Sequence, residues 1–355
     1  MEFTYKLMLA MAVSAGVTFA ATPLVRKLAF KVGAIDVPKD ERRVHTQPIP
    51  RLGGLAIFFG FLVSYLLFTN MEMIKMVGIL GGGLVIVGTG VVDDIHPLRA
   101  RTKLLLQIVS AVILYFCGFR IDFFTNFINP ELGIVSIGFL SLPVTVFWII
   151  GITNTVNLID GLDGLAAGIS SISAVTLTYV ALIIGQQDGS LMVHMNEVAI
   201  LTIIVAGACL GFLPYNFNPA KIFMGDAGSL FLGFILATAS VEGALKWPTV
   251  IAFAIPILAL GIPIFDTTFA IIRRALSGRP ISEADKGHLH HRLMDVGMDQ
   301  KRAVLTLYLI AALLGAGAVF LTGSDFVNGA IVLTLASLMI MIPIRRTVMS
   351  NKTNK

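Results

Sequence analysis

The sequence is dominated by apolar runs about as long as a bilayer is thick. A helix needs about 20 apolar residues to cross the hydrocarbon layer, and such runs recur along the whole 355-residue chain. Hydrophobic residues make up 56% of the chain and charged residues 13%, which leaves too little polar surface for a soluble domain. The unbroken runs also exclude the alternating pattern of a membrane β-barrel. The sequence therefore predicts an all-α polytopic integral membrane protein.

We expect about eleven transmembrane helices in one transmembrane domain covering residues 1–355. The expected spans are residues 5–25, 52–69, 75–92, 104–117, 142–156, 165–185, 197–214, 228–243, 249–272, 303–322 and 327–344. The first is expected to stay uncleaved, because Arg26, Lys27 and Lys31 follow it at once. Turn-forming residues around 126–138 predict a small extramembrane β-hairpin.

The positive charges are distributed unequally between the two sides of this predicted topology. Of the 26 Lys and Arg residues, one side holds only Lys6, Lys75, Arg120 and Lys246. The positive-inside rule places the other side in the cytoplasm, with the N-terminus outside and the C-terminus inside. The net charge of +5 reflects this asymmetry. No basic segment is interleaved with aromatic residues, so no nucleic-acid partner is expected.

Four polar clusters all fall on the predicted cytoplasmic side, although they were not used to choose it. They are VVDDIHPLRARTK (91–103), NTVNLIDGLDG (154–164), YNFNPAKIFMGDAGS (215–229) and EADKGHLHHRL (283–293). The outer loops are short and carry few polar residues. We therefore expect the active site on the cytoplasmic loops.

The first cluster contains the adjacent carboxylates Asp93 and Asp94 after a long apolar run. Like charges side by side raise the pKa of one of them unless a cation neutralises the pair. A Mg²⁺ ion and a phosphate-bearing substrate would provide that cation and a use for the pair. The alternative is an ordinary carboxylate pair at a helix end in the headgroup region.

The second cluster spaces Asn154, Asn157, Asp160 and Asp163 three residues apart. Side chains at i and i+3 lie close together on a helix surface, so two amides and two carboxylates are expected in one cleft. Ionisable groups at membrane depth are functional candidates by default. Ordinary helix-capping and turn residues would explain one such side chain but not this density.

Asp226 lies between small residues just before another span, where Gly225 and Gly228 allow close backbone approach. The motif is weak alone and gains weight beside the others. Upstream, Asn216 and Asn218 flank a short Pro-containing turn.

Three histidines, His288, His290 and His291, stand beside Arg292 in the longest predicted cytoplasmic loop. Zinc would require cysteine or an HExxH pattern, and neither accompanies them. Imidazole with guanidinium and ammonium groups suits pyrophosphate better. Arg51, in HTQPIPRLGG, repeats this chemistry at the start of the second span, with a basic interfacial anchor as the alternative reading.

Carboxylates for a metal, cations for phosphates and a membrane site for a lipid together indicate a phosphoryl-type reaction at the cytoplasmic interface. The absence of a GxxxxGK[ST] motif argues against an ATP-driven pump. A transporter, the alternative from another class, would place polar groups near mid-span and show internal repeats. Asp266, within the ninth span, is either an internal partner of Arg273 and Arg274 or a site residue.

The motifs Asp93–Asp94, N-x-x-N-x-x-D-G-x-D-G-L, F-M-G-D-x-G-S-L and H-L-H-H-R-L, in this order, resemble the polyprenyl-phosphate N-acetylhexosamine-1-phosphate transferases. The resemblance covers about residues 5–345. P-x-P-R-L-G-G and D-K-G-H-L-H-H-R-L are similar to the bacterial branch that uses UDP-GlcNAc. The phospho-MurNAc-pentapeptide translocases are less similar, because they typically carry a lysine soon after the paired aspartates, where this chain has Pro97. Translocase activity remains the alternative among enzymes.

The resemblance implies transfer of GlcNAc-1-phosphate from UDP-GlcNAc to undecaprenyl phosphate, which gives GlcNAc-diphospho-undecaprenol and UMP. It implies Mg²⁺ as the cofactor, with Mn²⁺ as an alternative ion. The expected setting is the bacterial cytoplasmic membrane, at the first lipid-linked step of an envelope polymer such as wall teichoic acid. Family members often pair, so a homodimer is a further expectation.

Site roles follow from the same resemblance, motif by motif. Asp226 would be the principal magnesium ligand. Asp93 would deprotonate or hold the polyprenyl phosphate, with Asp94 alongside. The remaining residues would line the nucleotide and metal region or contact the pyrophosphate and sugar: Asp160, Asp163, Asn154, Asn157, Asn216, His288, His290, His291, Arg292, Lys103 and Arg51. Direct attack by the lipid phosphate is favoured, because a phosphate is already largely ionised at neutral pH.

Overall fold

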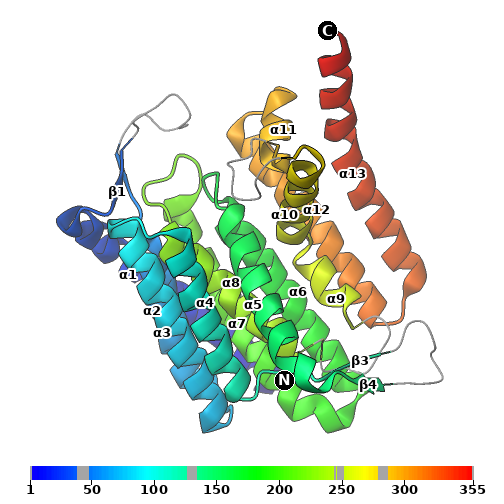
Figure 1. Cartoon of the computed structure of the whole chain (residues 1–355). Helices are drawn as coiled ribbons and strands as arrows, with labels where there is room; N and C mark the ends of the chain where they lie inside the picture. Colours follow the sequence, from blue (N-terminus) through cyan, green and yellow to red (C-terminus); the bar gives the residue numbers. More distant parts are fainter. Residues whose placement is uncertain are drawn as a thin grey trace.

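The structure, a computed structural model, describes residues 2–37, 48–125, 134–243, 245, 252–278 and 287–353, and most of them are helical (Figure 1). The helices are α1 (Glu2–Val32), α2 (Gly53–Phe68), α3 (Met73–Ile95), α4 (Ala100–Phe116), α5 (Ser141–Leu158), α6 (Leu165–Gln187), α7 (Met192–Asn216), α8 (Gly225–Glu242), α9 (Ala254–Ala259), α10 (Gly261–Leu276), α11 (Leu289–Asp295), α12 (Gln300–Thr322) and α13 (Phe326–Thr353). Two 3₁₀ turns, η2 (Gly138–Leu140) and η3 (Gly189–Leu191), begin α5 and α7.

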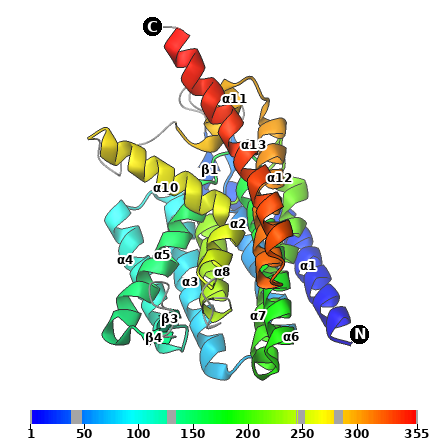
Figure 2. The same ribbon diagram turned by 90° about the vertical axis from the view of Figure 1, so that its right-hand side faces the viewer.

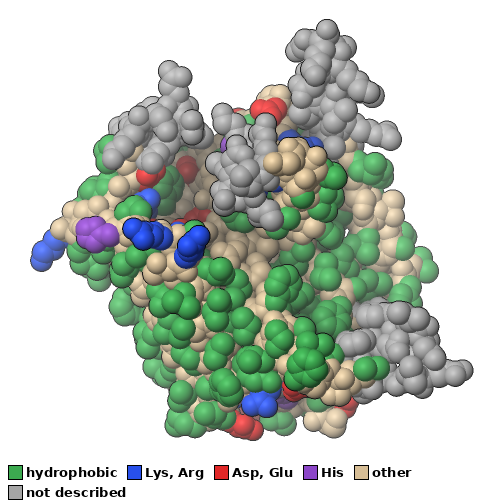
Figure 3. Space-filling model, in the orientation of Figure 1, with side chains coloured by type: hydrophobic (Ala, Val, Ile, Leu, Met, Phe, Trp, Pro, Cys, Tyr) green, Lys and Arg blue, Asp and Glu red, His purple; other side chains and the backbone are tan. Residues whose placement is uncertain are grey.

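The bundle has the apolar surface of a membrane protein. Within the described residues, six helices are long and apolar enough to cross a membrane, and Gly53–Phe68 and Phe326–Met341 are shorter apolar helices. Figure 3 shows a broad belt of hydrophobic side chains around the helices, with Lys, Arg, Asp and Glu gathered mostly beyond its ends. The prediction of an all-helical, multi-span membrane protein is therefore confirmed. The number of eleven spans stays a prediction.

Helix α8 forms the centre of the bundle. Every residue from Ala227 to Glu242 is buried, and α8 packs against α2, α3 and α5. A helix that is apolar on all sides is stable only when neighbours cover all of it. Its first turn is consequently held in place by the surrounding helices, and this turn carries Asp226.

The single helix expected over residues 249–272 is wrong. The described part of that segment contains the six-residue α9 and the separate α10, with a break at Leu260 (φ −104°, ψ 23°). Pro263 lies in the first turn of α10, and a proline there cannot donate the backbone hydrogen bond that would continue α9 into α10. The break redirects α10 outward, and Figure 2 shows it crossing the bundle at an angle.

Two small antiparallel hairpins lie at opposite ends of the bundle (Figure 1). Strand β3 (Phe123–Thr125) pairs with β4 (Ile134–Ser136), which confirms the predicted hairpin, although its strands begin earlier than residue 126. The expected tip, residues 126–133, lies outside the described residues. Strand β1 (Ile35–Asp36) pairs with β2 (Ile49–Pro50), and this second hairpin was not predicted.

The two ends of the chain lie at opposite ends of the bundle in both ribbon views (Figures 1 and 2). The start of α1 is at the same end of the bundle as β3 and β4, whereas the end of α13 is at the end that carries β1 and α11. An odd number of crossings would produce this arrangement. The side with β1 and α11 is the one to which the polar clusters converge.

Candidate active site

A cavity of about 830 Å³ opens at the end of the bundle that carries β1 and α11. It is lined by residues from all four polar clusters, which are as far apart in the sequence as Asp94 and His291, and also by Arg51. The predicted site residues that line it are Arg51, Asp94, Asn157, Asp160, Asp163, Asn216, Asp226, His290 and His291. The clusters that the sequence placed on one side of the membrane therefore meet in one cavity.

One side of the cavity is an acidic floor, lined by Asp94, Asn157 and Asp226, with Asp93 and Lys103 directly behind Asp226. The Lys103 ammonium lies 2.6 Å from Asp226 Oδ2 and 2.9 Å from Asp93 Oδ2, so one cation bridges two carboxylates. The amide of Asn157 donates to Asp226 Oδ1 at 3.1 Å and to the Ser229 hydroxyl at 2.8 Å. Both oxygens of Asp226 are thus engaged, one of them by a positive charge.

Asp94 holds the first turn of α8 in place at this floor. Its two carboxylate oxygens accept hydrogen bonds from the backbone N–H groups of Asp226 and Ala227, at 3.0 and 3.1 Å. These donors belong to the first turn of α8, whose N–H groups have no partner within the helix. Asp94 is 4% exposed. It therefore orients the backbone that carries Asp226, a role that the motif alone did not reveal.

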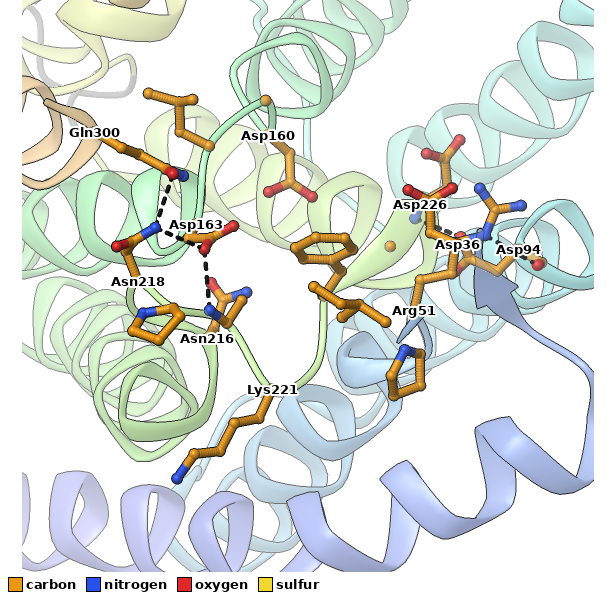
Figure 4. Close-up of a pocket in the computed structure, with 18 of the residues that line it drawn as sticks. Asp36, Arg51, Asp94, Asp160, Asp163, Asn216, Asn218, Lys221, Asp226 and Gln300 are labelled. Atoms are coloured by element: carbon orange, nitrogen blue, oxygen red, sulfur yellow. Dashed lines mark hydrogen bonds between the residues drawn. The ribbon is translucent and has the colours of Figure 1, made fainter. Parts of the chain in front are cut away.

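Arg51 reaches the floor because its segment pairs with the loop before α8. The Phe223 N–H donates to the Pro50 carbonyl at 2.8 Å, and the Gly53 N–H donates back to the Phe223 carbonyl at 2.9 Å. This pairing sets the Arg51 Nε 3.3 Å from the Asp94 carbonyl oxygen. Figure 4 shows Arg51 beside Asp94 and Asp226 at one side of the cavity.

The other side of the cavity is formed by the acidic loop, residues 159–164 between α5 and α6. Asp163 Oδ2 accepts hydrogen bonds from the Asn218 amide and the Ala220 N–H, both at 3.0 Å. Asn218 also donates to Gln300 Oε1 at 2.7 Å. Figure 4 shows Asn218 between Asp163 and Gln300, with Asp160 projecting between this group and Asp226.

Asp160 lies in the acidic loop, outside the membrane-spanning helices, and its pKa is shifted far from the ordinary value of a carboxyl group. Burial raises its pKa to about 7, and the negative charges of Asp226 and Asp163 add to the effect. A cation beside Asp160 and Asp226 would reverse that effect, because it favours the ionised form.

A histidine wall, formed by His288, His290 and His291 on and before α11, faces the acidic loop. Asp266 of α10 anchors it: its carboxylate lies 2.9 Å from His288 Nδ1 and accepts from the Leu289 N–H at 2.7 Å. His290 is 4% exposed. Burial, with a further contribution from His291, lowers the pKa of His290 to about 4. His290 is therefore neutral at pH 7.

Asp266 thus contacts the histidine wall, and both of its expected roles, as a site residue and as an internal partner of Arg273 and Arg274, stay predictions. It does not line the large cavity. It lies instead beside a second, mainly apolar cavity of about 400 Å³ between α10, α11 and α13. Arg292 lines this second cavity and donates to the Gly287 carbonyl at 3.1 Å.

Several predicted residues lie behind the cavity rather than on its surface. Asp93 and Lys103 reach it through Asp226, and His288 reaches it through α11. Asn154 is one turn deeper in α5, where its amide donates to Gln107 Oε1 at 2.6 Å and to the Ile150 carbonyl at 2.8 Å. Its amide is therefore directed to α4 in this structure.

Some residues of the site were not singled out from the sequence. Gln107 is 3% exposed and joins α4, which carries Lys103, to α5. Gln300, at the start of α12, had no local motif. Asn218 was noticed only as part of a turn. Arg26, Asp36 and Lys221 also line the cavity, and only their charge in predicted cytoplasmic loops could have indicated them.

The floor offers oxygen donors to a hard cation. The described residues contain no group of three or more His, Cys, Asp or Glu arranged to hold a metal ion. Mg²⁺ typically needs only one or two protein carboxylates, because water and substrate phosphates complete its shell. Asp226, with Asp160 and Asn157 lining the same cavity, fits that requirement, and Lys103 shows that Asp226 already attracts a cation.

Comparison with known proteins identifies the family. The model of glycosyl transferase family 4 matches residues 76–244. A probable undecaprenyl-phosphate N-acetylglucosaminyl 1-phosphate transferase of Bacillus subtilis is 41% identical, over 90% of this chain and 86% of the relative. A decaprenyl-phosphate N-acetylglucosaminephosphotransferase of Mycobacterium tuberculosis is 36% identical, over 93% and 87%.

A phospho-N-acetylmuramoyl-pentapeptide-transferase of Desulforudis audaxviator is 34% identical, over 87% of this chain and 98% of the relative. These matches extend well beyond the segment of the family model and include the histidine wall. Together with the convergence of the four motifs in one cavity, they show that this chain belongs to glycosyl transferase family 4, a family of sugar-phosphate transferases of the membrane.

Proposed function

We propose that this protein transfers GlcNAc-1-phosphate from UDP-GlcNAc to undecaprenyl phosphate and releases UMP. The observation that carries the proposal is the 41% identity, over most of both chains, to a relative named for that reaction. The cavity supports it independently, because carboxylates, cations and buried imidazole meet there at the end of a membrane bundle. The transporter alternative required polar groups near mid-span, and the described cavity lies at one end instead.

We propose Mg²⁺ as the cofactor, held by Asp226 with Asp160 and Asn157 nearby. When bound, it would neutralise phosphate charge and provide a template for the two substrates. Burial is the main cause of the raised pKa of Asp160, and the negative charges of Asp226 and Asp163 add to it; these neighbouring carboxylates support the assignment, because a cation among them is favoured. Mn²⁺ has the same preference for oxygen ligands and would be an alternative ion.

In the proposed reaction, an oxygen of the lipid phosphate attacks the phosphorus that carries the sugar. The bond from that phosphorus to the oxygen shared with the uridine-bearing phosphate breaks, and UMP leaves. Catalysis of this kind depends on positioning and charge neutralisation. Lys103 and Arg51 would supply positive charge at the floor, and Asp93 would hold the lipid phosphate through Lys103. His290, neutral at pH 7, would donate or accept one hydrogen bond at the sugar or pyrophosphate.

The proposal places the cavity at the cytoplasmic face of a bacterial plasma membrane, with eleven spans and the N-terminus outside. The product would begin an envelope polymer such as wall teichoic acid. The homodimer stays a prediction, because the surface of the described residues gives no evidence for or against it.

The experiment that tests the proposal is UMP release by the purified protein with undecaprenyl phosphate and Mg²⁺. UDP-GlcNAc and UDP-MurNAc-pentapeptide are offered in parallel, because a 34% identical relative is named for the second activity. We expect turnover with UDP-GlcNAc alone. Turnover only with the pentapeptide substrate would contradict the proposal and keep the family.

A further inference from the structure

One contact between α12 and the acidic loop has no part in the proposed chemistry. The hydroxyl of Tyr308, just over two turns into α12, donates a hydrogen bond of 2.5 Å to the carbonyl oxygen of Gly164. The two residues are 144 positions apart in the sequence. Tyr308 does not line the large cavity. Its hydroxyl therefore contacts the site only through the loop.

Gly164 is fixed on its other side by α7. Its N–H donates to Asn216 Oδ1 at 3.1 Å, and the Asn216 amide in turn donates to the Ile222 carbonyl at 3.0 Å. The backbone of Gly164 is left-handed, with φ of 80°, which glycine adopts without strain. Asp163 directly precedes it. The N–H of this residue is thus held by α7, and its carbonyl accepts both from Tyr308 of α12 and from the Gly168 N–H of α6, the latter at 2.9 Å.

The approach of Tyr308 to the loop depends on a second glycine. Gly168, one turn into α6, lies so close to the tyrosine ring that a methyl group on it would overlap the ring and its hydroxyl. The ring therefore packs directly against the start of α6. This fit is specific to the pair, since a larger residue at 168 would push the hydroxyl away from Gly164.

Helix α12 is also linked to the histidine wall, which faces the acidic loop across the cavity. The histidine wall on α11 is joined to α12 by residues 296–299 and packs against it. The two sides approach each other at Gly161, where an added methyl group would be 3.2 Å from His290 Nε2. A single helix is therefore linked to both sides: through its N-terminus to the histidine wall, and through Tyr308 to the acidic loop.

We propose that Tyr308 is a positioning residue, whose hydroxyl sets the acidic loop at a fixed distance from the histidine wall. The inference rests on the proposed function only in assigning the loop carboxylates to the reaction. Without the hydroxyl, the ring would keep its packing against Gly168, and the Gly164 carbonyl would keep the Gly168 N–H, at 2.9 Å, as its donor, but the hydrogen bond that ties the loop to α12 would be lost. Asp160 and Asp163 would then sample positions outside the productive geometry, and small misplacements of reacting groups are costly to turnover.

The test compares Tyr308→Phe with the matched control Tyr179→Phe, which removes the same hydroxyl from a ring on α6 that is 57% exposed. Hydrogen–deuterium exchange of the substrate-free protein is followed for peptides covering residues 159–165. UMP release with UDP-GlcNAc then gives kcat and KM. The thermal midpoint of each variant reports whether packing is kept.

For Tyr308→Phe we expect faster exchange confined to residues 159–165, with kcat lower by about tenfold and KM changed less. The thermal midpoint should stay within about 3 °C of wild type. Tyr179→Phe should match wild type in all three. Unchanged exchange in Tyr308→Phe would overturn the inference, as would a loss of turnover that only follows the fraction of folded protein.

Gly168→Ala provides a second, independent way to withdraw the hydroxyl. If it folds, it should reproduce the exchange pattern of Tyr308→Phe, and normal protection of residues 159–165 in a folded Gly168→Ala variant would count against the proposal. Inactivity of the wild-type protein with UDP-GlcNAc would contradict the proposed function alone, because the exchange measurement needs no substrate.

Discussion

The floor and the histidine wall are both anchored by a carboxylate that accepts hydrogen bonds from the start of a helix, but the two helices differ in how they are supported. On the floor, buried Asp94 accepts from the first turn of α8. On the histidine wall, partly buried Asp266 accepts from the first residue of α11. However, α8 has 18 residues, buried from Ala227 onward, whereas α11 has seven, of which His290 and Leu293 are buried.

The difference indicates what holds each side. Helices shorter than about 12 residues are marginal without tertiary contacts, so α11 depends on its anchor. Helix α8 would stay in place without Asp94, because its neighbours enclose it. The floor should therefore be rigid whatever binds, and the histidine wall should be the adjustable side.

The largest effect is expected at the floor itself. Asp226→Asn removes the charge that Lys103 neutralises and that a cation would use, so kcat should fall by about a thousandfold or more. The fold should be kept, since an asparagine can still accept from Asn157. UMP release measures the loss, with the exposed Asp295→Asn as the matched control. Near-normal turnover would remove Asp226 from the metal site.

The next effect should come from releasing the histidine wall. Asp266→Ala withdraws the acceptor of His288 and Leu289, and we expect kcat/KM to fall by about a hundredfold. Hydrogen exchange should accelerate over residues 288–297 and remain unchanged in α8. If α11 keeps its protection in this variant, the wall does not depend on its anchor.

A smaller loss is expected when the corresponding anchor of the floor is weakened. Asp94→Asn leaves one acceptor oxygen for two N–H donors, which corresponds to about 1 to 2 kcal/mol and about a tenfold lower kcat. Exchange in α8 should stay as slow as in wild type. Rapid exchange at the start of α8 would show that both sides depend equally on their carboxylates.

The smallest effect concerns pH. His290 is neutral in the folded protein down to about pH 4 but has an ordinary pKa near 6.5 when unfolded. The unfolded state thus binds more protons between those values, so the stability contributed by neutral His290 is present above pH 6.5 and is lost as the pH falls toward 4.

The thermal midpoint in detergent should accordingly fall across that range, and less steeply in His290→Gln. Equal slopes for both proteins would show that His290 does not contribute. Turnover between pH 6.5 and 8 should not follow the titration of His290.

Much of the fold and the position of the site could be predicted from the sequence. The features that were not predicted have physical explanations. The apolar runs located the helices, and the charge of the loops placed the four clusters at one end. The break at Leu260 was not predicted because the surrounding residues are apolar throughout. Pro256 and Pro263, which flank it, were therefore included in one span. Helix α11 was expected to be a loop because seven residues leave little periodicity to detect.

Within the site, Asn154 illustrates the limit of spacing arguments. A step of three residues falls about 60° short of a full turn, so Asn154 points toward α4 while Asn157 faces Asp226. Helix α5 ends at Leu158, and beyond it a helical spacing no longer places Asp160 or Asp163. Gln107 and Tyr308 were missed because their partners are distant in the sequence and no local motif marks them.

The proposed role of Asp226, to hold the cation that meets the substrate phosphates, can be tested by anomalous diffraction from crystals grown with Mn²⁺ and UDP-GlcNAc. We expect a manganese peak in direct contact with the Asp226 carboxylate, with the Lys103 ammonium displaced from it and the peak lost in Asp226→Asn. A peak elsewhere in the cavity, or bound nucleotide with no metal at Asp226, would contradict this role.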